Sequence, residues 1–96
     1  MYTKVFKALA HPIRIKIVKK LINVELCVCE LNENVEFTQS NLSQHLKILK
    51  DAGILKSEKD GLKIMYSIKD KRVIEIINIV DNMIKDEIEN MSKKFI

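Results

Sequence analysis

Cys27 and Cys29 are the only cysteines of this chain, and a single residue separates them. Paired thiolates bind soft metal and metalloid ions, and thiols also react with oxidants. The pair lies just upstream of a segment, residues 38–51, whose pattern is typical of a DNA-reading helix. An ion or oxidant captured by the two sulfurs would deform the element that positions this helix. The pair is therefore a candidate switch.

Length and charge limit the number of domains, the size of the core and the class of partner. The 96 residues form one domain, residues 1–96, with a modest core, because a chain of this size buries only about two thirds of its unfolded surface. The net charge of +4 and pI near 9.1 favour a polyanionic partner. No apolar run approaches the ~20 residues of a transmembrane helix, and no signal-peptide core follows the N-terminus. We expect a cytoplasmic protein with no membrane partner, whose cysteines stay as thiols.

The apolar pattern predicts a mostly helical fold. Pro12 suits the first turn of a second helix, so the first helix should end near His11. Thr38 fits an N-cap and Gly53 a helix terminator, with residues 34–37 as the preceding connection. The predicted helices cover residues 5–10, 12–21, 28–32, 38–52 and 73–91.

A β-hairpin and a long last helix complete this prediction. Strands over 54–58 and 63–68 are joined through 59–62, where Asp60-Gly61 is a strong hairpin signal. From Val73 to Met91 the apolar residues step by three or four, which predicts an amphipathic helix. A small monomer cannot fully cover this stripe, so we expect a homodimer, although the stripe could also pack on its own domain.

Polar side chains cover one face of the predicted fourth helix, opposite a stripe of Leu42, Leu46 and Leu49. Short polar side chains at the N-terminal end of such a helix hydrogen-bond base edges or phosphates in the major groove. The basic hairpin would grip phosphates beside it. A helix, a turn, a second helix and a basic hairpin together predict a winged helix-turn-helix that binds double-stranded DNA. The candidate DNA-binding residues are Gln39, Ser40, Asn41, Ser43, Gln44, His45, Lys47, Lys56, Lys59 and Lys63.

The two histidines favour structural roles. His45 lies at the edge of the leucine stripe, where packing or a phosphate contact is favoured over metal ligation. His11 precedes Pro12 at a helix junction, and we expect it to be hydrogen-bonded there.

Three segments carry a family resemblance: FKALAHPIR at 6–14, ELCVCEL at 25–31 and QSNLSQHLKILKDAGIL at 39–55. Together they resemble the ArsR/SmtB family of metal-sensing repressors, over about residues 4–70. The resemblance implies a winged helix-turn-helix homodimer built through its first and last helices. It also implies a protein that binds operator DNA without metal and releases it with metal, and that is not an enzyme.

The Cys-Val-Cys segment resembles the arsenite site of the arsenic-responsive members. The resemblance implies that Cys27 and Cys29 are thiolate ligands for trivalent arsenic or antimony, which acts as inducer with no obligatory cofactor. Residues two apart on a regular helix point about 200° apart, so one ion would take both sulfurs only if the helix unwinds. Asn32 stands where these members often carry a third cysteine. The last helix carries no histidine, which argues against the family's zinc site there.

Other readings stay open. The effector could be another soft metal, such as cadmium or lead, or an oxidant or reactive sulfur species. A disulfide between thiols one residue apart would be strained, so redox sensing would sooner pair cysteines across subunits or modify one thiol. The cysteines could also be small buried hydrophobes in a metal-blind regulator. A thiol enzyme is disfavoured, since there is no Cys-x-x-Cys spacing and no placed histidine base.

Overall fold

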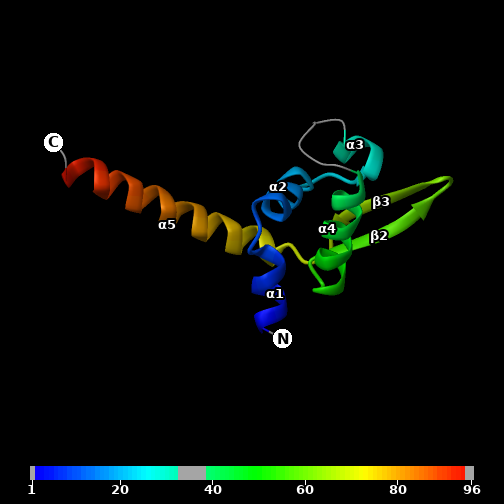
Figure 1. Cartoon of the computed structure of the whole chain (residues 1–96), viewed down its shortest axis with the longest axis horizontal. Coiled ribbons are helices and arrows are strands. Elements are labelled where there is room, and N and C mark those ends of the chain that lie inside the picture. The colour runs from blue at the N-terminus through cyan, green and yellow to red at the C-terminus, as the bar shows by residue number, and fades with distance from the viewer. Residues whose placement is uncertain (1, 33–38, 95–96) are drawn as a thin grey trace.

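The computed structural model describes residues 2–32 and 39–94, and Figure 1 shows their arrangement. In chain order the elements are α1 (Tyr2–Leu9), α2 (Pro12–Lys20), β1 (Leu26–Cys27), α3 (Val28–Asn32), α4 (Gln39–Asp51), β2 (Leu55–Asp60), β3 (Lys63–Ile68) and α5 (Arg72–Lys94). The predicted connection over 34–37 and the predicted N-cap Thr38 lie outside the described residues. The mostly helical fold with a hairpin is confirmed.

Local capping explains where the helices begin and end. His11 adopts an extended backbone, and its Nδ1 accepts the Ile13 N–H at 3.1 Å, which makes it the N-cap of α2 with Pro12 following. The structural role expected for His11 is thereby confirmed. Gly53, at φ +79°, ends α4 in a Schellman motif, in which Ile54 N–H donates to the Leu49 carbonyl and Gly53 N–H to that of Lys50, each at 3.0 Å.

Strands β2 and β3 form a hairpin, here called the wing, which is part of a three-stranded antiparallel sheet in the order β1-β3-β2. Asp60 pairs with Lys63, so a two-residue loop joins β2 and β3. Gly61, at φ +63°, occupies the first loop position, where a two-residue hairpin of type II′ requires a positive φ. Strand β1 was not predicted, because its two residues are too few to produce an alternating pattern.

The core gathers leucine and isoleucine side chains from most of the helices and from the sheet. Its fully buried members include Ile17, Val18, Leu21, Leu31, Leu42, Leu46, Leu49 and Leu55. The leucine stripe predicted for α4 is thus confirmed as its buried face. Val73 and Ile77 anchor the start of α5 to this core.

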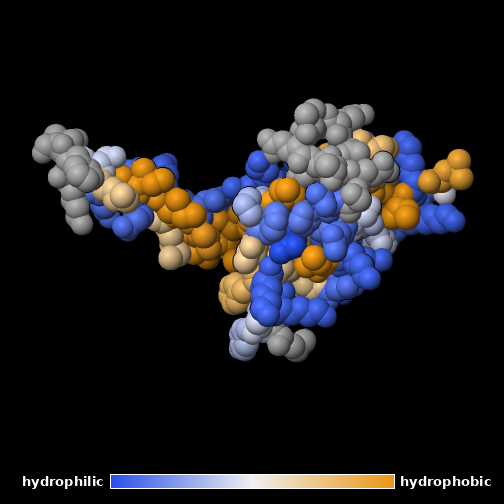
Figure 2. All heavy atoms as spheres, viewed as in Figure 1, coloured by the Kyte–Doolittle hydropathy of each residue, from blue (hydrophilic) through white to orange (hydrophobic). Residues whose placement is uncertain are grey.

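Beyond Ile77, helix α5 projects away from the body as a long arm (Figure 1). The radius of gyration is 15.4 Å, against about 13 Å for a compact domain of this length. Apolar side chains line the arm in the open (Figure 2). None of the described helices is both long and apolar enough to cross a bilayer.

Candidate nucleic-acid interface and thiol site

Helix α4 presents a polar face to solvent. Its exposed side chains lie on the side of the helix opposite the buried leucines, as the helical period requires. They are Asn41, Ser43, Gln44 and Lys47. Gln39 and Ser40 belong to the first turn of α4, but their side chains lie outside the described set. The exposed face carries amide, hydroxyl and ammonium groups, which suit base edges and phosphates.

His45 turns from this face toward the junction of α1 and α2. Its Nδ1 lies 3.3 Å from an Arg14 guanidinium nitrogen, which can only donate, and its ring centroid lies 4.6 Å from that of His11. Burial, with the charges of His11 and Arg14 beside it, lowers the pKa of His45. Arg14 also donates to the carbonyls of Ala8 and Lys7 at the end of α1, at 2.6 and 3.2 Å. The predicted packing role is thus visible, while a phosphate contact by His45 stays a prediction.

The three wing lysines are all exposed but do not share one face. Because side chains alternate along a strand, Lys56 and Lys63 project from one face of the ribbon and Lys59 from the other. Lys59 and Lys63 lie near the loop, whereas Lys56 lies at the root of the wing. Asp60 pairs with Lys63 across the ladder, so the tip is less uniformly basic than the lysines alone indicate.

Cys27 and Cys29 are joined by a disulfide, with their Cα atoms 5.4 Å apart. This corrects two expectations, that the cysteines stay as thiols and that oxidation would pair cysteines across subunits. The physical reason is that Cys27 ends the extended strand β1 while Cys29 lies in the first turn of α3. The backbone changes direction between them, so the roughly 200° divergence of a regular helix does not apply.

Glu30 closes a reciprocal cap around Cys27. The Cys27 N–H donates to the Glu30 carboxylate at 3.2 Å, and the Glu30 N–H donates to Cys27 Sγ at 3.4 Å. This is the geometry of a capping box with sulfur in place of the usual hydroxyl. Cys27 is only 2% exposed, whereas Cys29 is exposed. Cys27 therefore belongs to the interior of the fold and Cys29 to its surface.

The donor set around the cysteines is small. In the described part of the chain, no three His, Cys, Asp or Glu side chains converge as a metal site. Once reduced, the pair would offer two thiolates, which fit a thiophilic ion. A third ligand for such an ion would have to be a group other than the His, Cys, Asp and Glu side chains of the described residues. On α5, Asp81 pairs with Lys19 at 3.1 Å, and Asp86 and Glu87 are exposed.

Helices α3 and α4 pack together, and the antiparallel wing lies beside α4. This arrangement defines a winged helix-turn-helix DNA-binding protein. Residues 11–57 match the model of the bacterial regulatory protein, arsR family. An uncharacterized HTH-type transcriptional regulator of Methanocaldococcus jannaschii is 43% identical over 81 residues, covering 83% of this chain and 91% of that protein. The chain belongs to the ArsR family of bacterial regulatory proteins.

Relatives with named roles differ in their effectors. The arsenical resistance operon repressor of Bacillus subtilis is 44% identical over 73 residues, covering 75% of this chain and 70% of that protein. A cadmium resistance transcriptional regulatory protein CadC homolog of Staphylococcus aureus is 40% identical over 77% of this chain, which spans 62% of that protein. Similarity at this level establishes the family and leaves the effector open.

Solved structures agree with the fold. The crystal structure of Mycobacterium tuberculosis Rv0081 superposes with a TM-score of 0.84 at 32% identity, covering 93% of this chain and 90% of that one. A Mycobacterium bovis domain described as a homodimeric winged helix-turn-helix gives a TM-score of 0.82 at 24% identity, covering 93% and 82% of the two chains. The second likeness concerns the fold alone.

Proposed function

We propose that this protein is a repressor that binds operator DNA as a homodimer and is released when Cys27 and Cys29 capture trivalent arsenic or antimony. The observation that carries the proposal is the placement of the two cysteines, whose Cα atoms lie 5.4 Å apart where β1 ends and α3 begins. After reduction, one soft ion can bind both thiolates without first unwinding the helix. As arsenous acid, As(OH)3, or its antimony counterpart binds, each thiol proton leaves with one hydroxide as water, so two ion–sulfur bonds form as two ion–oxygen bonds break.

An ion inserted between the sulfurs must separate them. Because Cys27 is buried, its sulfur cannot move without disturbing what packs around it. Helix α3 packs against α4, and Leu31 of α3 is fully buried in the same core as Leu42. Cys27 also pairs with Met65 of the wing strand β3. Displacement there would reach both DNA-contacting elements, at a coupling free energy of typically ~1–3 kcal/mol.

The DNA contacts follow from the exposed faces described above. Asn41, Ser43, Gln44 and Lys47 would face the major groove together with Gln39 and Ser40, while Lys59 and Lys63 would meet phosphates from the wing. Lys56 and His45 remain candidates for phosphate contacts. A dimer would present two such surfaces to two half-sites of an operator.

The homodimer is supported by the uncovered apolar surface of α5. Ile79, Val80, Met83, Ile84, Ile88 and Met91 are each 45–64% exposed. An apolar groove of about 390 Å³ runs between Phe6 of α1 and Ile84 of α5. A second copy that packs its own α1 and α5 there would remove this surface from water.

The test is an ultraviolet absorbance titration of the fully reduced chain with arsenite, antimonite, cadmium and zinc. We expect a saturating sulfur-to-ion band with arsenite or antimonite that is lost in Cys27→Ser and in Cys29→Ser. In parallel, fluorescence anisotropy on a duplex selected from a random pool should show release by the same ion. Both variants should still bind the duplex, which separates a sensor pair from cysteines needed only for folding. A band with cadmium alone would reassign the effector to a divalent soft metal such as cadmium or lead.

A second candidate function, redox sensing, is favoured by the disulfide itself. An oxidant such as a peroxide would take two electrons and two protons from the two thiols, forming the S–S bond and two water molecules. Operator affinity measured without metal, before and after oxidation, discriminates the two candidates. A large loss on oxidation, absent in Cys29→Ser, would favour the redox sensor. Equal affinity of both forms, with no ion band, would leave the cysteines structural.

A further inference from the structure

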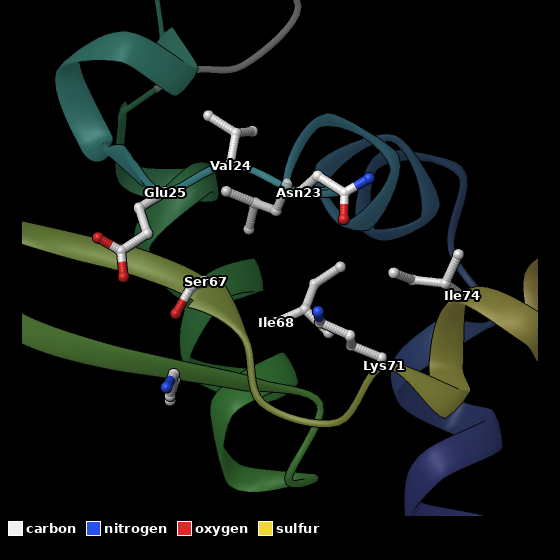
Figure 3. A pocket seen from close by; sticks show the side chains of 9 residues that line it. Asn23, Val24, Glu25, Ser67, Ile68, Lys71 and Ile74 are labelled. Carbon is white, nitrogen blue, oxygen red and sulfur yellow. The ribbon is translucent and has the colours of Figure 1, made fainter.

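A second cavity lies at the root of the sheet, and neither Cys27 nor Cys29 lines it. It has a volume of about 370 Å³ and is open to solvent on one side. The turn after α2, the root of β2 and β3, and the start of α5 enclose it (Figure 3). This volume falls within the ~300–1,000 Å³ range of small-molecule pockets.

The cavity has an apolar floor. Leu21 is fully buried, and Ile68 and Ile74 are half-buried around it. In Figure 3 the side chain of Ile74 points from α5 toward the side formed by Ile68, with Asn23 to Glu25 along the far rim. Such a floor accepts a hydrocarbon or aromatic body, because contact there removes apolar surface from water.

The rim is charged and its cations are available. Lys56 and Lys71 line the cavity, and neither takes part in the ion pairs found among residues 2–32 and 39–94. The nearest acid in sequence, Asp70, is occupied by Arg72, whose guanidinium lies 2.6 Å from the carboxylate. Hydrogen bonds from Arg72 hold the pKa of Asp70 at about 2. Asp70 is therefore ionised near neutral pH and paired with Arg72. Lys71 is left to pair with a ligand.

Polar neutral groups complete the rim. Ser67 offers a hydroxyl and Asn23 an amide, each able to donate or accept a hydrogen bond. Asn23 holds a positive φ of 61°, a conformation that asparagine tolerates better than most residues. Two lysines against the single carboxylate of Glu25 make the rim net cationic.

We propose that this cavity binds a small amphipathic carboxylate, with its apolar body on the floor and its carboxylate at Lys71. The ligand would lie where the wing root meets α5. Backbone hydrogen bonding from Lys69 N–H to the Ile54 carbonyl, at 2.9 Å, ties the same region to the end of α4. The site is separate from Cys27 and Cys29 and does not depend on the function proposed for them.

The test is a ¹H–¹⁵N nuclear magnetic resonance titration of the full chain with sodium octanoate. Saturable shifts should centre on the amides of Asn23, Ser67, Lys71 and Ile74. Lys71→Glu should weaken octanoate binding about tenfold, because the attraction becomes a repulsion. Lys69→Glu is the matched control, since Lys69 is exposed, carries the same charge change and does not line the cavity. It should bind octanoate as the parent chain does.

Three results would overturn the proposal. One is the absence of saturable shifts at the lining amides. Another is equal weakening by Lys71→Glu and Lys69→Glu, which would indicate only nonspecific attraction to a basic protein. The third is a set of shifts confined to residues 79–91, which would place octanoate on the open apolar face of α5. Unchanged spectra of the two variants without ligand would show that both remain folded.

Discussion

The side chains of Arg14, His45 and His11 show how single residues connect separate elements. Arg14 joins the end of α1 to His45 of α4, and His11 caps α2 while its ring meets that of His45. The position of the DNA-facing helix therefore depends on a neutral His45, since Nδ1 must accept from Arg14. His45 is thus a residue whose protonation weakens a contact between elements.

Stability should accordingly fall in mild acid. The folded-state pKa of His45 is lowered from 6.5, so below about pH 6.5 the unfolded chain binds more protons than the folded one. The free energy of unfolding should be level above that pH and decline beneath it. Urea unfolding between about pH 8 and about pH 5 measures this. His45→Gln should flatten the decline, and an identical decline in that variant would contradict the assignment.

The Asp70–Arg72 pair acts in a different range. The pKa of Asp70 is lowered from 3.8 to about 2, so its contribution is complete above pH 3.8 and is lost as the pH falls toward 2. Because this acid window lies well below that of His45, the two effects can be separated in one series of unfolding curves.

Base reading and phosphate binding should also separate at single residues. Gln44→Ala removes an amide from the exposed face of α4, so affinity for the selected operator should drop by about 1–3 kcal/mol while nonspecific binding changes little. Lys63→Ala removes a wing cation, so affinity should weaken evenly across sequences and the salt dependence should flatten by about one unit of slope. Anisotropy titrations over several salt concentrations measure both. Equal loss of discrimination in the two variants would refute this division.

Among single residues, exposure was easier to predict than pairing. The helical period placed Leu42, Leu46 and Leu49 inside and the polar residues of α4 outside, because one rule governs both. The bond between Cys27 and Cys29 depends on a change from strand to helix at Val28, which no periodicity encodes. The contact of His45 with Arg14 spans 31 positions, and it required the fold to be seen.

At the scale of elements, the end of α4 determines where the wing begins. Gly53→Ala should destabilise the fold by about 1 kcal/mol, because φ of +79° disfavours any side chain. No atom lies within 4 Å of an added Cβ, so the cost is conformational and free of steric clash. Gly53→Asn should cost less, since asparagine tolerates this region. Thermal or urea unfolding of the two variants measures the difference, and equal losses would indicate that packing is at fault.

The elements themselves were predictable where a cap or a period marked them. Pro12, Gly53 and Gly61 marked boundaries that the structure confirms to within a residue or two, and the C-terminal period marked α5. Strand β1 has two residues and exists only because β3 pairs with it, so its cause is tertiary. The cavity between Ile68 and Ile74 is likewise a product of packing between elements.

At the scale of the whole molecule, an arm that leaves its own core implies a partner. Val73 and Ile77 are 4–5% exposed, whereas Ile84 is 53% exposed, so the amphipathic stripe of α5 is only partly used within one chain. The stripe alone could not decide between self-packing and dimerisation. In the structure, residues 78–92 of α5 are exposed, so most of the helix does not pack on its own domain.

Ile84→Glu should therefore convert the proposed dimer to a monomer, because a carboxylate would be buried without a partner at the interface. Loss of the second DNA-binding surface should lower operator affinity about a hundredfold. Lys85→Glu introduces the same side chain at the next position, and as Lys85 is not among the apolar residues of the stripe, it should leave the dimer intact. Sedimentation equilibrium gives the oligomeric state and anisotropy gives the affinity. A monomeric Ile84→Glu chain with unchanged affinity would show that one copy suffices for operator binding, and a dimeric one would place the interface away from α5.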